Sequence, residues 1–394
     1  APTAVGQILN HVHANTGETR RFICAPCRRR VMSLARPASA SAAAARLPVL
    51  WSRRHNISGQ SLLSSPQRHR QGGATQVLGR PRSTAQVHIG VRAVAAEPMD
   101  SAALMEGFHR CVASCNDAGD AQSQFVPWTV EGKVAGYLTQ EMVQALSNYP
   151  DVFSVVAGDS VELNGSLRTI EARNAAMAKV TADLRDKGVI TGWRDELFPV
   201  IQSFSSEPLL LVERAAATQL GIKAYGVHIN GFVRRPDGSK QLWVGRRSKT
   251  KQTWPGMLDH IVAGGQPHGI SPQENVVKEC GEEAGIPPAL AAAAVPAGAV
   301  SYSCMYKGNL KRDVMFVYDI ELPESFVPQP QDGEVEEFML WPMSKVMQVV
   351  AEGVQFKPNC QLIIIDFLIR HGHITPEQHG YLELLASLRS GDCS

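Results

Sequence analysis

Apolar and polar positions alternate with regular periods from about residue 101 to the end of the chain, and these periods predict its helices and strands. Residues 101–116 place their apolar side chains on one face of a helix. Two strands joined by a turn at 131–132 are expected next, followed by a helix that Thr139 caps. A further helix is predicted over 173–188, where the final glycine suits the left-handed conformation that ends helices.

From Tyr225 onward the pattern changes to strands separated by tight turns. Two runs rich in β-branched and aromatic residues flank the turn at 236–238, which predicts a hairpin. Residues 259–265 are expected to form a buried strand that enters a glycine-rich loop. A second hairpin is predicted over 299–323, and a late buried helix over 359–372.

A well-delimited helix follows the glycine-rich loop. Ser271 is its expected N-cap, and Pro272 occupies the first helical position, where a missing N–H costs nothing. The helix is predicted to run to about Ala284, and Gly285 ends it.

Length and composition limit the class of protein. The chain has 394 residues and 44% hydrophobic content, enough for one or two packed cores. Its longest apolar runs, such as 362–365, are far shorter than the ~20 residues of a membrane span, so a soluble protein is expected. Eight cysteines spread over this length favour a reducing compartment, and the Cys24–Cys27 pair, with no second pair, is interpreted as incidental.

Charge is distributed unevenly. The first hundred residues hold 14 arginines, no lysine and three acidic residues. A nucleic-acid-binding arm is disfavoured because aromatic residues that stack on bases are scarce there. The Ser/Ala-rich stretch from Met32, itself a plausible start, resembles a chloroplast transit peptide, with a processing site expected at 91–96. Residues 1–98 are therefore predicted to be a disordered transit segment, and the mature protein to reside in the plastid stroma.

Three glutamates gather on one face of the helix after the glycine-rich loop. Glu279, Glu282 and Glu283 fall within about 100° of one another on a helical wheel. Because like charges raise one another's pKa, such a group is unfavourable unless a cation neutralises it. Mg²⁺ or Mn²⁺ suits these oxygen ligands, and Gly264 and Gly265 allow the backbone to approach a phosphate. The alternative is a solvated acidic helix face.

The stretch 264–286 resembles the Nudix box: a glycine, five residues, Glu, seven residues and then Arg-Glu-apolar-x-Glu-Glu-x-Gly-apolar. Six positions match at the required spacing: Gly264, Glu279, Glu282, Glu283, Gly285 and Ile286. Two positions depart, because Ile270 stands where the first Glu belongs and Lys278 replaces Arg. That Glu and Arg usually form a salt bridge in the family. Glu274, four residues before Lys278, is expected to take over the pairing.

Longer blocks resemble one subfamily, the thiamine-pyrophosphokinase-related Nudix hydrolases of plants, algae and fungi. "YGVHINGFV", "KRDVMFVYDIELP" and "DGEVEEFMLW" carry this resemblance, and "GWRDELFPV" resembles the extra N-terminal domain of the subfamily. The resemblance implies an α/β fold: a Nudix α/β/α sandwich with a mixed sheet, preceded by a small α+β domain and a disordered N-terminal tail. The expected boundaries are 1–98 for the tail, 99–222 for the α+β accessory domain and 223–394 for the Nudix hydrolase domain.

The same resemblance implies a divalent-metal-dependent diphosphatase. Its substrates would be of the thiamine diphosphate type, preferentially the damaged analogues oxothiamine and oxythiamine diphosphate, cleaved to the monophosphate and phosphate. Alternatives are a Nudix hydrolase of nucleoside diphosphate derivatives such as ADP-ribose or dinucleotides, and a non-catalytic thiamine diphosphate-binding protein. An isopentenyl diphosphate isomerase is disfavoured, since "TWPGMLDH" lacks the cysteine expected there. The expected partner is a small-molecule diphosphate, with no nucleic acid or membrane; a homodimer is possible.

Candidate site residues follow from the box and its surroundings. Glu279, Glu282 and Glu283 are the expected metal ligands. Glu334 is the expected further catalytic carboxylate, with Glu336 and Glu337 competing for that role. The expected substrate-binding residues are Arg246, Arg247, Lys249, Gly264, Gly265, Trp254 and Tyr302, with Tyr306 as a further aromatic candidate. Before residue 223 no catalytic group is expected: Trp193 is interpreted as buried, and Arg194 as paired with an acidic residue.

Overall fold

The computed structural model describes residues 100–156 and 160–392. The transit segment predicted over residues 1–98 and the Cys24–Cys27 pair lie outside these residues. Within the described part, none of the helices combines the length and apolar character that crossing a bilayer requires.

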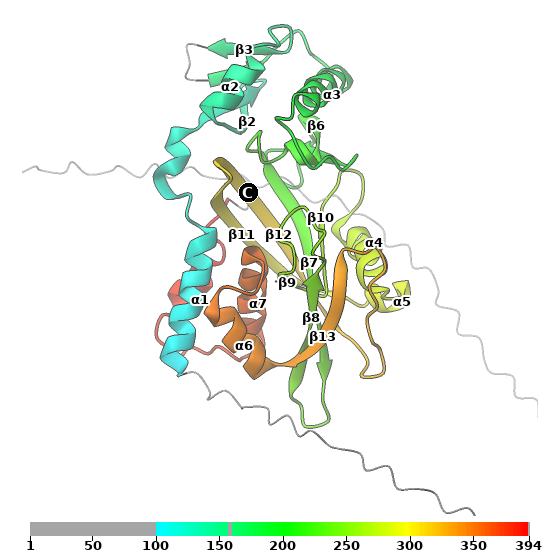
Figure 1. The fold of residues 1–394 in the computed structure, drawn as a ribbon. Helices are drawn as coiled ribbons and strands as arrows, with labels where there is room; N and C mark the ends of the chain where they lie inside the picture. The colour runs from blue at the N-terminus through cyan, green and yellow to red at the C-terminus, as the bar shows by residue number, and fades with distance from the viewer. Residues whose placement is uncertain (1–99, 157–159, 393–394) are drawn as a thin grey trace, which may run out of the picture. The chain divides into compact units, whose positions relative to one another are not determined.

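A seven-stranded sheet forms the centre of the C-terminal half, in the order β11-β12-β7-β8-β13, with β10 paired to β7 and β9 to β8 (Figure 1). Its strands are β7 (Lys223–Arg234), β8 (Lys240–Arg247), β9 (Leu258–Asp259), β10 (Val262–Gly265), β11 (Val295–Tyr306), β12 (Asn309–Glu321) and β13 (Val335–Pro342). β7 and β12 run parallel, whereas β7–β8 and β11–β12 are antiparallel, so the sheet is mixed. The antiparallel pairs confirm both predicted hairpins.

Helices cover both faces of this sheet (Figure 1). One face carries α4 (Pro272–Ala284) and α5 (Pro288–Ala291), and the other carries α1 (Ser101–Cys115), α6 (Met343–Glu352), α7 (Pro358–Arg370) and α8 (Tyr381–Ser387). Successive residues of β8 show the alternation that a two-sided sheet requires. Leu242 and Val244 pack in the core with α6 and α7, while Trp243 packs in the core with α4. The predicted α/β/α sandwich is confirmed.

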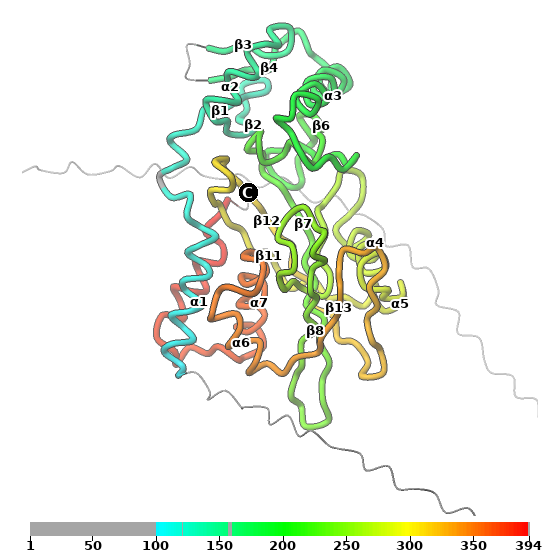
Figure 2. The backbone as a smooth tube through the Cα atoms, viewed as in Figure 1, coloured from blue at the N-terminus to red at the C-terminus, as the bar shows by residue number. Residues whose placement is uncertain are grey.

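Helix α1 belongs to the core of the sandwich, although it precedes the accessory domain in sequence. Phe108 is fully buried among residues of α6, α7 and α8. Gly107 allows α1 to approach α6 closely, since a Cβ atom at that position would lie 2.4 Å from the carbonyl oxygen of Ala351. The Cys111 thiol donates to the carbonyl oxygen of Val350, 3.1 Å away. Figure 2 shows the chain leaving α1 and entering the small domain before it returns to the sandwich.

The small domain has an α+β fold with its own core. A sheet in the order β2-β1-β4-β3 packs with two helices, and β5 and β6 form a separate pair. Its elements are η1 (Gly119–Gln124), β1 (Val126–Val130), β2 (Lys133–Leu138), α2 (Gln140–Leu146), β3 (Phe153–Val156), β4 (Ser160–Leu163), α3 (Ile170–Asp186), β5 (Leu197–Val200), β6 (Leu210–Glu213) and η2 (Arg214–Ala216). Trp128 is fully buried in this core, and its indole N–H donates to the carbonyl oxygen of Leu220 at 2.8 Å.

Local sequence signals fix the ends of the helix that carries the three glutamates. The Ser271 hydroxyl accepts a hydrogen bond from the N–H of Glu274 at 3.2 Å, and the Glu274 carboxylate accepts one from the N–H of Ser271 at 2.7 Å. This reciprocal capping box satisfies two backbone donors that a helix start would otherwise leave free. Gly285, at φ 62°, ends α4 in the left-handed conformation. Both predicted ends are confirmed.

Replacing Ser271 with Ala should lower the free energy of unfolding by about 1 kcal/mol, because the N–H of Glu274 loses its acceptor. Urea titration followed by circular dichroism measures the change. Ser271→Asn is the matched control, since its side-chain oxygen still accepts that hydrogen bond and most of the stability should return. An Asn variant as unstable as the Ala variant contradicts the capping role.

Candidate functional site

The glutamate face of α4 packs directly on β10, where glycine leaves room for it. A Cβ atom at Gly264 would lie 2.3 Å from the carboxyl carbon of Glu279, so no other residue fits there without displacing that carboxylate. Glu283 accepts a hydrogen bond from the N–H of Ala263 at 2.9 Å. Strand and helix therefore hold two carboxylates in fixed positions against the backbone.

Burial differs sharply among the three glutamates. Glu279 and Glu283 are each 9% exposed, whereas the Glu282 side chain is 54% exposed. Burial raises the pKa of Glu279, and it raises the pKa of Glu283 well above its usual value, helped by the nearby negative charges of Glu279, Asp259 and Glu334. The ionised form of a buried carboxyl group is unfavourable by itself. A cation between two such groups stabilises that form.

Lys278 makes a different contact from the predicted one. Its ammonium group lies 3.2 Å from Glu279 and 2.8 Å from Glu282. Glu274, its expected partner, is instead held by the capping box with Ser271. The predicted Glu274–Lys278 pair is therefore wrong, because the capping interaction orients Glu274 toward the helix start. Lys278 places a positive charge among the carboxylates.

A cavity of about 730 Å³ opens between α4, the main sheet and the small domain. Ten of the predicted candidate residues line it: Glu279, Glu282, Glu283, Glu334, Gly264, Gly265, Arg247, Trp254, Tyr302 and Tyr306. The sizes of small-molecule sites in proteins run from about 300 to 1,000 Å³. The structure thus brings carboxylates from α4 and from the loop before β13 to one space.

Arg247 reaches the cavity, but its guanidinium group is already engaged. It donates to Asp259 at 2.7 Å and to the carbonyl oxygens of Thr253 and Trp254 at 2.9 and 3.0 Å. These bonds fix the loop after β8, so Arg247 acts chiefly on the shape of the cavity wall.

Arg246 and Lys249 are not among the residues that line the cavity. Arg246 follows the alternation of β8 to the other side, where it donates to Glu337 at 2.8 Å. The Lys249 side chain is 80% exposed and lies 3.8 Å from Glu336. Neither cation lines the candidate phosphate site. Their partners Glu336 and Glu337, the competing candidates for the further carboxylate, are exposed and do not line the cavity either.

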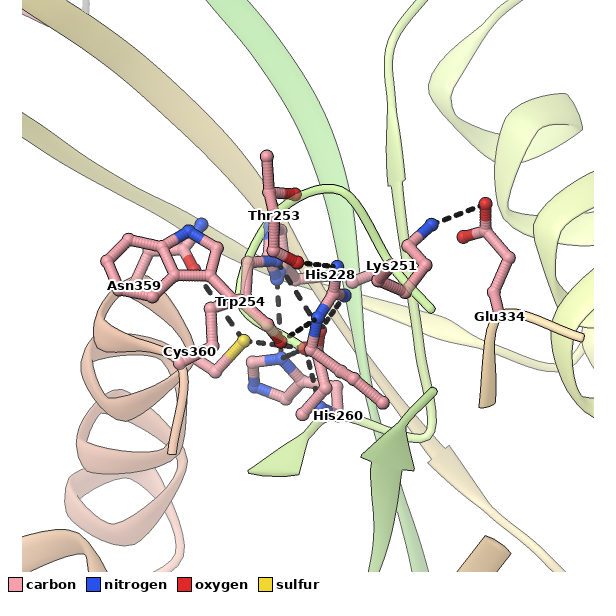
Figure 3. A network of polar contacts seen from close by, with 12 residues as sticks. His228, Lys251, Thr253, Trp254, His260, Glu334, Asn359 and Cys360 are labelled. Carbon is pink, nitrogen blue, oxygen red and sulfur yellow. Dashed lines mark hydrogen bonds and ion pairs between the residues drawn. The ribbon is translucent and has the colours of Figure 1, made fainter. Parts of the chain in front are cut away.

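Glu334 forms an ion pair with Lys251 at the cavity wall (Figure 3). Burial by itself would raise the pKa of Glu334, but Lys251 and the more distant Arg194 and Arg247 lower it below its usual value. The carboxyl group is therefore ionised at neutral pH and faces the space shared with Glu283.

Aromatic side chains line another part of the same space. The rings of Trp254 and Tyr306 lie 6.1 Å apart at an angle of 38°. Trp254 adopts a φ of 52°, which is uncommon for a residue with a side chain. Tyr302 is 3% exposed, donates its hydroxyl to Asp313 and lies under the Lys311 ammonium group. Trp254 and Tyr306 are consequently the more accessible pair for a flat ring.

Residues of the small domain complete the wall, and sequence analysis did not find them. Gly265 allows their approach, since a Cβ there would lie 2.7 Å from the Phe198 ring and 3.1 Å from the Arg214 guanidinium carbon. Arg214 also pairs with Glu196 at 2.7 Å. No motif in the small domain marks these residues, because the cavity exists only where the two domains meet.

Arg194 contradicts its expected role. Among the described residues no acidic oxygen lies within ion-pair distance of its guanidinium group, and the side chain is exposed and lines the cavity. Its backbone N–H, and not its side chain, donates a hydrogen bond to the Glu213 carboxylate at 2.9 Å. Trp193 is only half-buried and donates to Asp195 at 2.7 Å. The interpretation of a buried Trp193 beside a paired Arg194 is wrong.

The chain matches two family models and is similar in sequence to several known proteins. Residues 107–224 match a domain of unknown function (DUF4743), and residues 224–359 match the NUDIX domain. Nudix hydrolase 20, chloroplastic, of Arabidopsis thaliana is 48% identical over 298 residues, which cover 74% of this chain and 79% of that protein.

Two further relatives give the same picture. Nudix hydrolase 24, chloroplastic, of Arabidopsis thaliana is 47% identical over 298 residues, covering 75% of this chain and 81% of that protein. An uncharacterized protein of Saccharomyces cerevisiae is 46% identical over 215 residues, covering 50% of this chain and 61% of that protein. With this identity over most of the relatives' length, and with the carboxylates of α4 gathered at one cavity, the chain belongs to the Nudix hydrolase family.

Proposed function

We propose that this Nudix hydrolase is a Mg²⁺- or Mn²⁺-dependent diphosphatase that cleaves thiamine diphosphate-type substrates, preferentially the damaged oxothiamine and oxythiamine forms. The observation that carries the proposal is the single cavity in which Glu279, Glu282, Glu283 and Glu334 face cationic and aromatic side chains. A diphosphate ester with a flat ring at its other end matches that arrangement in both charge and shape.

The carboxylate group fits a divalent cation. Glu279 and Glu283 are buried with raised pKa values, a condition that a bound cation relieves by stabilising their ionised forms. All the donors are oxygens, which Mg²⁺ and Mn²⁺ prefer. Glu279, Glu282 and Glu283 would hold the metal, which supplies charge stabilisation at phosphorus and an acidified water when bound.

Side chains of this chain position the diphosphate. Arg194, from the small domain, and Lys251, from the loop after β8, bring positive charge to the cavity, and Lys278 of α4 adds a third cationic group. An arginine whose side chain has no acidic partner among the described residues is suited to a bidentate grip on phosphate oxygens. The proposed reaction cleaves the phosphoanhydride bond with water and leaves thiamine-type monophosphate and phosphate.

The choice of ring follows from the resemblance to the thiamine-pyrophosphokinase-related subfamily and from the aromatic wall. Trp254 and Tyr306 offer stacking surfaces that suit either ring of a thiamine-type molecule. The alternative substrates, nucleoside diphosphate derivatives such as ADP-ribose, would use the same carboxylates and the same aromatic wall. Substrate comparison therefore decides between them.

Glu282→Gln should reduce turnover by about two orders of magnitude or more, because a neutral amide weakens the proposed metal site. Steady-state kinetics with thiamine diphosphate analogues at saturating Mg²⁺ measure this. Glu274→Gln is the control: it removes one charge from the same helix, at the capping box, and should leave turnover near that of the parent. Unchanged turnover in Glu282→Gln places this glutamate on an ordinary solvated helix face.

The kcat/KM for oxothiamine and oxythiamine diphosphates should exceed that for intact thiamine diphosphate by about 10-fold or more. The diphosphate is the same in all three, so discrimination must arise at the ring. A ring pocket discriminates between the forms by ~1–3 kcal/mol through its shape, and by more when it hydrogen-bonds the altered atom. Equal values for intact and damaged forms contradict the preference. Faster turnover of ADP-ribose than of any thiamine compound favours the nucleotide alternative.

We propose a plastid location, supported by the arginine-rich N-terminal segment and by two relatives that are named chloroplastic. Residues 1–98 fused to a fluorescent protein should direct it into chloroplasts, and the mature enzyme should begin near Ala96. Residues 99–394 fused in the same way are the control and should stay in the cytosol. An intact N-terminus on enzyme isolated from plastids contradicts processing at this position.

A further inference from the structure

Beside the cavity, two imidazoles and a thiol converge in a fully buried cluster (Figure 3). His228 lies on β7, His260 follows β9, and Cys360 lies in the first turn of α7; they are 5%, 4% and 0% exposed. One donor atom from each lies within 4.8 Å of the other two. Residues from two strand segments and a helix, separated by up to 132 positions in sequence, thus bring three metal-ligating groups together.

The frame that holds the cluster is rigid. His228 pairs with Ala263 in the β7–β10 ladder, which fixes its strand relative to the segment containing His260. Two backbone hydrogen bonds join β9 to the start of α7: Leu258 N–H to Gln355 at 2.9 Å, and Lys357 N–H to Leu258 at 2.9 Å. The donors are therefore placed by sheet and helix.

The spacing of the two imidazole nitrogens matches tetrahedral coordination. Nδ1 of His228 and Nδ1 of His260 are 3.3 Å apart. Two bonds of about 2.0–2.1 Å from a zinc ion at the tetrahedral angle separate their nitrogens by about 3.3 Å. An ordinary hydrogen bond between two neutral imidazoles also fits that single distance. What that hydrogen bond does not account for is a third metal-ligating group, the Cys360 sulfur, within 4.8 Å of both nitrogens.

An oxygen donor stands next to the trio. Oδ1 of Asp259 lies 2.6 Å from the Cys360 sulfur and 3.7 Å from Nδ1 of His260. Its other oxygen is held at 2.7 Å by Arg247 and at 3.5 Å by Lys357. The carboxylate is thus anchored through one oxygen, while its other oxygen, Oδ1, faces the cluster and also accepts a hydrogen bond from the backbone N–H of His260 at 2.9 Å.

We propose that His228, His260 and Cys360 form a second metal site, for a zinc-class divalent ion, with Asp259 as the nearest oxygen donor. Two nitrogens and a sulfur suit Zn²⁺ and disfavour Mg²⁺, which takes oxygen ligands. On binding, the Cys360 thiol loses its proton to solvent and binds as thiolate at the N-terminal end of α7, where the helix dipole favours an anion.

This site uses other residues than the glutamates of α4 and does not rest on the proposed substrate. A bound ion would tie α7 to β7 and to the β9–β10 segment beside the cavity, which His228 and Lys357 help to line. It would thereby fix this part of the cavity wall and the loop that Arg247 holds.

Cobalt substitution tests the site, because thiolate–Co²⁺ charge transfer absorbs in the near ultraviolet and carboxylate-bound Co²⁺ does not. The full chain is used with Cys24 and Cys27 both replaced by Ser, since that pair also offers two thiols. Excess Mg²⁺ occupies the glutamates. One equivalent of Co²⁺ should produce the band, Zn²⁺ should displace it, and further Mg²⁺ should not.

Cys360→Ser should abolish the band and weaken Zn²⁺ binding. Losing a residue that only hydrogen-bonds a metal ligand costs about 10–100-fold in affinity, and losing the ligand itself should cost more. Cys304→Ser, a half-buried cysteine of β11, is the matched control and should keep both. His260→Asn retains the thiol and should shift the band and weaken Zn²⁺ binding. Circular dichroism confirms that each variant is folded. A folded parent without the band, or a band that survives Cys360→Ser, overturns the site and leaves a hydrogen-bonded core cluster.

Discussion

The site depends on the close contact between helix α4, which carries the three glutamates, and strand β10, which ends in two glycines. Glu279 can lie against the backbone only because Gly264 has no side chain, and Glu283 is fixed by the N–H of Ala263. The same contact buries both carboxyl groups and raises their pKa values. Packing α4 on β10 therefore removes solvation from two charges, and a cation is the natural compensation.

Much of the sandwich follows from local sequence signals. Ser271, Pro272 and Gly285 define α4 because caps and helix breakers act within one turn of themselves. The hairpins follow from alternation around Gly238 and Gly308, whose φ values of 83° and 78° match tight turns. Gly264 and the α4 glutamates follow from spacing alone, since one strand, one loop and one helix carry them.

What sequence analysis missed depends on long-range contacts. Arg194 and Arg214 reach the cavity from the small domain, and no periodicity within that domain indicates which of its arginines face outward toward another domain. Arg246 was expected at the site beside Arg247, but neighbouring residues of a strand point to opposite faces. Lys278 was assigned to Glu274 from helix spacing, and a capping interaction took precedence.

The position of α1 has a consequence for how the chain acquires its structure. The Cys111 thiol meets Val350 across 239 positions of sequence, so α1 has its apolar face uncovered until α6 and α7 exist. The small domain, whose core is drawn from residues 126–222, has all its parts much earlier. During synthesis the inserted domain can therefore fold first, while α1 remains an exposed amphipathic segment. Packing α1 against helices so distant in sequence is slow, and the intermediate with α1 exposed is the species most open to aggregation or chaperone binding.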